Sequence, residues 1–242
     1  MDRIDNQIQR SLISHWEEFD TYITRLNASA SVEPKDGYSV FKYAGTEDGS
    51  AIFDLQPVLV NVPERATDTS SDLFVVVKGR LSIDRAHFEA EGKIRTLNFA
   101  TQVGYFRLKG GVLKHVFGAH YDFSESEVGH PVFHAQMRSF VQFSEVIKER
   151  YGLEEVVVDD GINGILKTVR LPSAQMDVFS FFLQLVADHL LSKDSSGDDR
   201  VRFLELLDKS KFIQGVGSVV SRLQVPPANF CYRAVHWYSP SS

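Results

Sequence analysis

The chain has 242 residues, of which 43% are hydrophobic and 24% are charged, and it carries a net charge of -6 with a single cysteine. This length allows a sizeable core, and the composition is ordinary for a folded protein. The negative charge argues against a broad nucleic-acid-binding surface. The lone Cys231 excludes an internal disulfide and a cysteine-rich zinc module.

The sequence also argues against membrane insertion and export. No apolar run approaches the roughly 20 residues that cross a bilayer. The first residues, MDRIDNQIQR, lack the apolar core of a secretion signal. We therefore expect a cytoplasmic protein with no membrane-spanning segment.

Residues 1–27 predict an amphipathic helix. Apolar residues recur at helical spacing along it, at Ile4, Ile8, Leu12, Trp16, Phe19, Ile23 and Leu26. The segment NASASVEPKDGYS then ends the helix with loop-forming residues. A single apolar stripe means that this helix packs on another part of the protein or on a partner.

Residues 39–139 are rich in strand-forming residues. Five runs of Val, Phe, Ile, Leu and Tyr precede residue 124, and turn-like segments such as TEDG and Gly110–Gly111 separate them. Short connections of this kind join antiparallel neighbours. The sequence therefore predicts a curved meander of about five or six strands.

Residues 140–242 predict mostly helices. One helix over SFVQFSEVIKERYG ends at Gly152, and a longer one follows Pro172 with Ser173 as its expected N-cap. Between them, LEEVVVDDGINGILKTVRL predicts two strands joined by a turn. A short helix over RVRFLELLDKSK and a final strand over ANFCYRAVHWY complete the chain. The expected fold is a single α+β domain over residues 1–242, with one curved antiparallel sheet and helices packed on it.

Four of the eight histidines lie in residues 115–139, HVFGAHYDFSESEVGHPVFHAQMRS. Successive side chains of a strand point to opposite faces. On both sides of the loop SESEVG the odd positions are mainly apolar, which places His115 on the apolar side. The even positions carry a shared set of polar side chains: His120, Asp122, His130, His134, Gln136 and Arg138.

The alternation leaves the pairing of these two runs open in two respects. One hairpin register opposes His120 to His134, and a register shifted by two opposes Asp122 to His130. Alternatively, residues 131–147 form a helix that begins at Pro131. Apolar residues fit that stripe as well, at Phe133, Met137, Phe140 and Ile147.

The polar set has the chemistry of a catalytic or metal site. His120, Asp122 and His134 offer two imidazoles and a carboxylate, which suit zinc or manganese. Without a metal, the same groups suit general acid–base catalysis, with Arg138 stabilising an anion. The alternative is a solvated polar face on which the histidines pair with Asp and Gln and have no further role.

Other sequence signals are weaker. Asp177 falls in the first turn of the long helix, where the helix dipole favours a carboxylate, and Asp188–His189 near its end could reach the same site. The sequence contains no Gly-rich phosphate loop, no G-x-S-x-G, no H-E-x-x-H and no paired C-x-x-C.

The segments HYDF, HPVFHAQ, RLPSAQMD and ADHLL resemble a pattern in prokaryotic families of domains of unknown function. Some of these families occur beside toxin–antitoxin or phage-defence genes. The resemblance covers about residues 115–190. It implies a bacterial cytoplasmic protein in which His120, Asp122, His130, His134 and Gln136 act together, with Asp177 and His189 as further binding residues.

Two functions follow as hypotheses. The first is a hydrolase or an RNase-like phosphodiesterase that uses the His/Asp face. The second is a non-catalytic protein of a toxin–antitoxin or defence system, which binds a protein partner through its first helix and a sheet edge. The overall acidity disfavours nucleic acid as a ligand, and a local basic strip of Arg107, Lys109 and Lys114 is the feature that favours it.

Overall fold

The computed structural model describes residues 1–26, 32–34, 37–62, 72–123, 133–158, 170–173, 176–192 and 195–214. Four predicted features lie outside these residues. They are His130, the turn at 159–161, Cys231 and the final strand over 228–238.

Nine strands of the described residues form one sheet: β1 (Val32–Glu33), β2 (Phe41–Glu47), β3 (Ser50–Val62), β4 (Asp72–Asp84), β5 (Thr96–Lys109), β6 (Val112–Phe123), β7 (Phe133–Met137), β8 (Val156–Val158) and β9 (Arg170–Pro172). Their order is β1-β3-β4-β5-β6-β7-β9, with β2 also on β3 and β8 also on β6. Strands β2 to β6 form the predicted antiparallel meander, and β7 continues it as the second strand of the hairpin. The short β8 differs from the expectation, because it pairs in parallel with β6.

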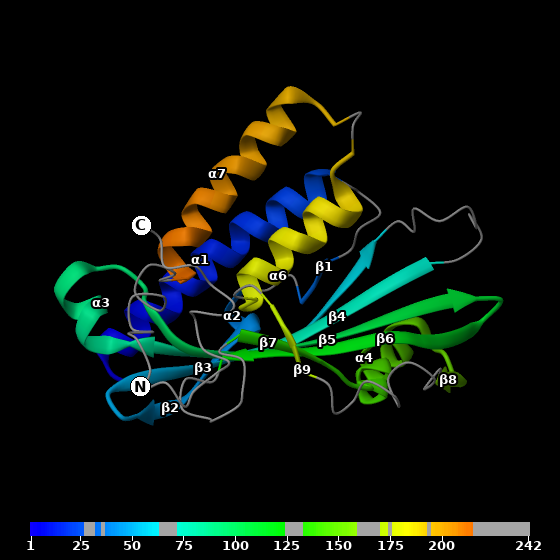
Figure 1. Cartoon of the computed structure of the whole chain (residues 1–242), viewed down its shortest axis with the longest axis horizontal. Coiled ribbons are helices and arrows are strands. Elements are labelled where there is room, and N and C mark those ends of the chain that lie inside the picture. The colour runs from blue at the N-terminus through cyan, green and yellow to red at the C-terminus, as the bar shows by residue number, and fades with distance from the viewer. Residues whose placement is uncertain are drawn as a thin grey trace.

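The helices that the structure describes are α1 (Arg3–Leu26), α2 (Gly37–Val40), α3 (Arg85–Glu91), α4 (Ser144–Tyr151), α6 (Val178–Leu185) and α7 (Gly197–Gln214). A 3-10 turn, Val141–Phe143, precedes α4, and a π turn, Val186–Leu190, follows α6. Helices α1, α6 and α7 stand on one face of the sheet, and α4 lies on the other (Figure 1). The fold class is α+β, as predicted. None of these described helices is long and apolar enough to cross a membrane.

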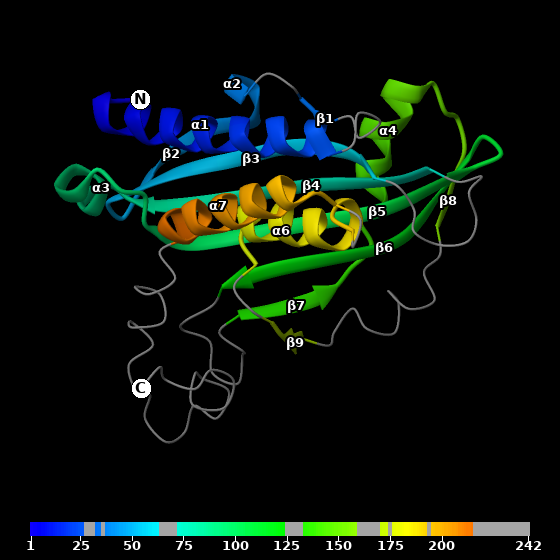
Figure 2. The same cartoon turned by 90° about the horizontal axis from the view of Figure 1, so that it is seen from above.

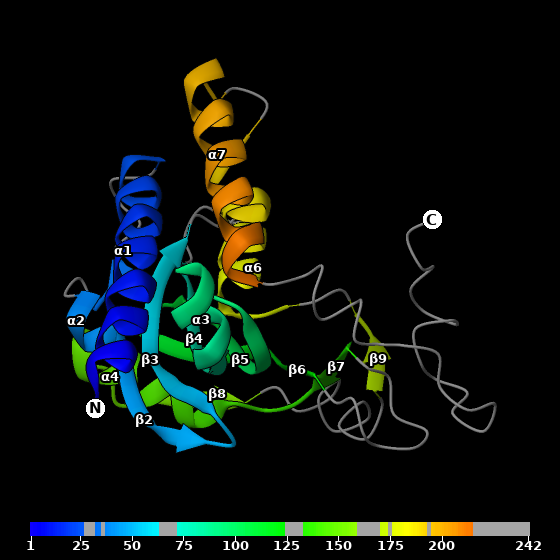
Figure 3. The ribbon, with the colours of Figure 1, turned by 90° about the vertical axis from the view of Figure 1, so that its left-hand side faces the viewer.

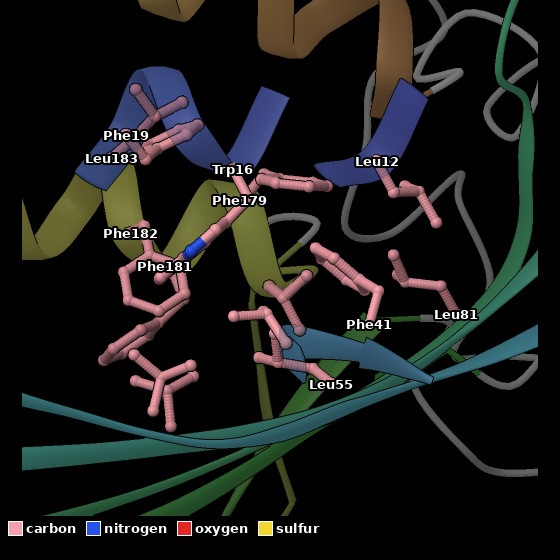
Figure 4. Close-up of a cluster of buried hydrophobic side chains, with 14 of the residues drawn as sticks. Leu12, Trp16, Phe19, Phe41, Leu55, Leu81, Phe179, Phe181, Phe182 and Leu183 are labelled. Atoms are coloured by element: carbon pink, nitrogen blue, oxygen red, sulfur yellow. The ribbon is translucent and has the colours of Figure 1, made fainter. Parts of the chain in front are cut away.

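The main core lies between the sheet and the three helices on its first face, which we call the helix face. Figure 4 shows aromatic side chains of α1 and α6 meeting there above the strands. The rings of Trp16 and Phe182 lie 4.9 Å apart, and those of Phe19 and Phe179 lie 5.7 Å apart. The predicted apolar stripe of α1 is therefore buried inside the protein.

A second, smaller cluster lies under α4 at one end of the opposite face. Its buried members are Leu59, Phe74, Val76, Phe106, Leu113, Phe140, Phe143 and Ile147. The rest of this face, which we call the open face, carries polar side chains on the alternate positions of β3 to β7. The same strands thus have an apolar side under the helices and a largely polar side away from them.

Two helix starts differ from the sequence-based expectation. Residues 85–91 lie in the region expected to be strand-rich but form α3, because the Asp84 carboxylate accepts the backbone N–H of His87 and Gly92 ends the helix at a φ of 65°. The long helix begins at Val178 and not near Ser173. Its N-cap is Asp177, whose carboxylate accepts the backbone N–H groups of Phe179 and Ser180.

A β-bulge in β6 reverses the predicted alternation at one point. Tyr105 pairs with Phe117, but the next residue of β5, Phe106, pairs with His115, so Val116 is an extra residue. His115 is buried as expected, but on the α4 side, where its ring lies 5.1 Å from that of Phe106. It does not share a face with Phe117, which is only half-buried on the helix face.

Candidate functional site

The hairpin of β6 and β7 has a register that neither prediction gave. Asp122 pairs with His134, and His120 pairs with Gln136. The cause is aromatic packing on the helix face: Phe123 pairs with Phe133, and both rings lie against Phe99, at 6.5 and 6.0 Å between centroids. Residues 133–137 form a strand, so the helical alternative is wrong there.

The register brings His120, Asp122 and His134 together on the open face, as the parity argument expected. Nε2 of His120 donates a hydrogen bond to Oδ2 of Asp122 over 2.8 Å. Nδ1 of His134 lies 2.7 Å from Oδ1 of the same carboxylate, and the two imidazole rings are 6.5 Å apart. One carboxylate therefore bridges two histidines.

The three side chains differ in their access to solvent. His120 is 18% exposed and Asp122 is 31% exposed, whereas His134 is only 1% exposed. Burial raises the pKa of Asp122, but the hydrogen bond from His120 and the contact with His134 outweigh it and hold this pKa well below its usual range. Asp122 is therefore a fixed anion beside one accessible imidazole and one buried imidazole.

The geometry gives no support to a metal centre. Within the described ranges, no group of three His, Cys, Asp or Glu side chains could hold a metal ion. The Asp122 carboxylate directs one oxygen to each imidazole, so these atoms face one another and not a shared point. The expectation of zinc or manganese at His120, Asp122 and His134 does not fit this arrangement.

The remaining predicted residues of the hairpin are less central. Gln136 lies beside His120 across the strand pair and is half-buried. Arg138 is exposed just after β7, and its guanidinium lies over the Phe140 ring at 6.0 Å. The structure thus turns Arg138 toward an aromatic ring and not toward the Asp122 carboxylate.

Asp177 and His189 do not join this site. Both belong to the α6 segment, which packs on the helix face, whereas His120 is on the open face. Asp177 is buried and serves as the N-cap of α6. The His189 ring lies 6.0 Å from the ring of Tyr105. The expectation that the end of this helix reaches the His/Asp face is wrong, because the sheet separates them.

Further polar residues lie beside the His/Asp group on the open face, and they were not predicted from the sequence. Residues paired across the strands form two rows that cross the sheet. One row contains Lys42, Asp54, Arg80, Ala100, Asp122 and His134, and the other contains Lys78, Gln102, His120 and Gln136. The same alternation that singled out the hairpin, applied to β4 and β5, points to these residues.

A depression lies on the same face, and its lining reaches Ala100, the residue that pairs with Asp122. It has a volume of about 390 Å³ and is lined by Glu47, Asp48, Ser50, Ile52, Arg80, Ser82, Asn98, Phe99 and Ala100. Arg80 is fixed at its side by Asp54, which accepts from Nε at 2.7 Å and from an η nitrogen at 3.2 Å. The small Ala100 lies between Arg80 and Asp122 in the same row.

The predicted basic strip lies elsewhere. Arg107 pairs with Lys114 and shares the parity of Tyr105, which places both on the helix face. The strip and the His/Asp group therefore occupy opposite sides of the sheet.

No family model matches the chain, and no curated protein and no solved structure is significantly similar to it. The geometry of the described residues therefore carries the functional argument.

Proposed function

We propose that the protein is a hydrolase in which His120 acts as the general base on a small polar substrate. The observation that carries this proposal is the His120–Asp122 hydrogen bond of 2.8 Å on an open, polar face of the sheet. A partly exposed imidazole held by a carboxylate that stays ionised is a recurrent arrangement for activating water or a hydroxyl group.

The hydrogen bond assigns roles to the ring atoms. Because Nε2 of His120 donates to Asp122, the proton of the neutral ring is on Nε2, and Nδ1 keeps the lone pair that accepts a proton. Asp122 then stabilises the imidazolium that forms, and Nδ1 of His134 lies 2.7 Å from the other carboxylate oxygen. In this scheme Asp122 and His134 are positioning residues.

The exposures favour a single-base hydrolase over an RNase-like mechanism with two histidines. Such a mechanism needs one imidazole to accept a proton and another to donate one, both in contact with the substrate. His134 is 1% exposed, so it meets that requirement poorly, while His120 at 18% meets it. The basic strip on the opposite face offers no help in holding a phosphate chain at His120.

The depression beside Ala100 is the substrate site in this proposal. Its volume of about 390 Å³ falls in the range of small-molecule pockets. Adjacent strands lie about 4.8 Å apart, so a group above Ala100 has Arg80 on one side and the His/Asp group on the other. Arg80, Ser82 and Asn98 would bind an anionic or carbonyl oxygen of the substrate.

The test is hydrolysis of p-nitrophenyl acetate, p-nitrophenyl phosphate and bis-p-nitrophenyl phosphate by the purified protein. We expect turnover of at least one of them, and we expect His120→Gln to reduce it by about 100-fold or more, as for loss of a general base. His87→Gln, on α3 and outside the lining of the depression, is the matched control and should retain full activity.

His134 is unsuitable as the first variant, because a side chain this buried also contributes to packing. Equal activity in the wild type and His120→Gln, or no turnover of any of the three esters, would contradict the proposal.

The rival hypothesis of a protein partner loses one of its two surfaces. The apolar stripe of α1 is buried in the core, so a partner in a toxin–antitoxin or defence system could not bind through that stripe.

A further inference from the structure

A second group of chemically informative side chains lies on the helix face, away from the His/Asp group. Tyr105 of β5 and Phe117 of β6 are directly opposite one another, with ring centroids 5.8 Å apart and planes at 63°. Both are half-buried. In such an edge-to-face pair, the ring that presents its edge keeps both of its faces clear of the other ring.

Phe117 has no part in the packing of the core. Tyr105 packs against the main cluster, whereas Phe117 belongs to neither that cluster nor the one under α4. In Figures 2 and 3 the helices α1, α6 and α7 stand mainly over β3 to β5, and β6 lies to their side. Farther along β6, Tyr121 still packs against Phe181 of α6, at 6.2 Å between ring centroids. A partly exposed aromatic ring on a β-sheet surface is available for stacking.

Basic side chains lie next to this aromatic pair. Arg107 and Lys114 are opposite one another in the neighbouring row of the same face, and Lys109 follows at the exposed end of β5. The bulge at Val116 sets this arrangement, because it turns Phe117 to the side on which Lys114 lies. Aromatic and basic side chains are thereby interleaved over two adjacent strands.

The π turn after α6 borders the pair from above. The His189 ring lies 6.0 Å from the Tyr105 ring, and Asp188 in the same turn is exposed. Burial, followed by the neighbouring Tyr121 and Asp188, raises the pKa of Tyr105, so its phenol stays protonated and can donate a hydrogen bond. Turns of this kind often occur at functional sites.

We infer that this surface, formed by Tyr105, Phe117, Arg107 and Lys114, binds single-stranded nucleic acid. An unpaired base can stack on a sheet-mounted aromatic ring, and adjacent Arg and Lys side chains neutralise its phosphates. A duplex keeps its bases stacked on one another, so it cannot use the rings. The net charge of -6 confines the interaction to this local basic region. The site is on the face opposite His120 and does not depend on the proposed hydrolase.

The direct test is fluorescence anisotropy of labelled eight-nucleotide oligouridylate and oligothymidylate at about 50 mM salt. We expect both to bind, and a preference for the RNA would show that the 2′-hydroxyl is contacted. Phe117→Ala should weaken binding about fivefold or more, which is the typical effect of removing one stacking ring. Phe117→Trp should retain or improve binding, which separates stacking from loss of folding.

A matched pair of charge variants tests the location. Arg107→Gln with Lys114→Gln removes two charges from the helix face, and Lys42→Gln with Lys78→Gln removes two from the open face. The first pair should weaken binding. It should also reduce the slope of log K against log salt by about 1.4, because each phosphate contact on a single strand contributes about 0.7 to that slope. The second pair should leave both quantities nearly unchanged.

The inference is overturned if neither oligonucleotide binds, if Phe117→Ala binds as the wild type does, or if the two charge pairs lose affinity equally. His120→Gln should bind nucleic acid normally, so failure of the proposed hydrolase is distinguishable from failure of this inference.

Discussion

The two faces of the sheet are built from alternate residues of the same strands, but they differ in composition and in what covers them. In β4, Val75 and Val77 are fully buried under the helices, whereas Lys78 and Arg80 point away from them and are exposed. The helix face owes its stability to aromatic packing that tolerates few changes. The open face carries charged side chains and the partly exposed imidazole of His120, beside the buried imidazole of His134. Stability and reactivity are thus separated across a single layer of backbone.

The largest expected effect on stability comes from Phe133 of the hairpin, and Phe117 provides the comparison. Phe133 is 1% exposed and lies against Phe99 and Phe123, so Phe133→Ala should lower the free energy of unfolding by about 3 to 5 kcal/mol. Phe117 is half-buried and outside both clusters, so Phe117→Ala should cost about 1 kcal/mol. Urea denaturation of the two variants measures both, and equal losses would show that Phe117 belongs to the core.

The helix layer should respond to acid through His15. This buried residue of α1 lies against Phe19 and Phe179, and its Nε2 is 2.9 Å from the hydroxyl of Ser210 in α7. Burial lowers its pKa from 6.5 to about 4.

The unfolded chain therefore binds the proton more readily than the folded one. The contribution of neutral, buried His15 to the free energy of unfolding is fully present above pH 6.5. It is lost as the pH falls from 6.5 toward 4, and the loss is at most about 3 kcal/mol. His15→Phe should flatten the dependence of stability on pH in this window. A variant curve parallel to that of the wild type would contradict this prediction.

Two aspartates offer a contrast of intermediate size. Asp177 accepts hydrogen bonds from two backbone N–H groups of α6 and from the Ser180 hydroxyl, so Asp177→Ala should cost about 1 to 2 kcal/mol. It should leave the turnover per folded molecule intact. Asp122→Asn should instead lower the turnover per folded molecule, because it removes the anion that orients His120. Thermal unfolding and ester hydrolysis, measured on both variants, decide between the two roles.

The smallest effects belong to exposed ion pairs. Lys209 contacts Glu18 between α7 and α1 at 2.6 Å, and Arg80 contacts Asp54 on the open face. Lys209→Gln and Arg80→Gln should each change stability by less than about 1 kcal/mol. Only Arg80→Gln should raise the KM for a substrate that the wild type hydrolyses. A similar KM in both variants would remove Arg80 from the proposed substrate site.

Much of the fold could be predicted from local pattern. The stripe from Ile8 to Ile23 and the runs of β2 to β6 indicated their elements, because burial of one face imposes a period of 3.6 or 2 on the sequence. Alternation also put His120, Asp122 and His134 on one face. Both predicted registers of the hairpin were wrong. Phe123 pairs with Phe133 and both pack against Phe99, and this pairing makes the loop longer than either prediction assumed.

The sequence by itself determined which side chains could share a face, because parity along a strand is a local property. Only the tertiary structure decided which face that was and what covered it. The bulge at Val116 moved His115 to the α4 side and set Phe117 beside Lys114. The sheet itself separated His189 from His120. These outcomes depend on contacts between residues far apart in the chain, which no local period encodes.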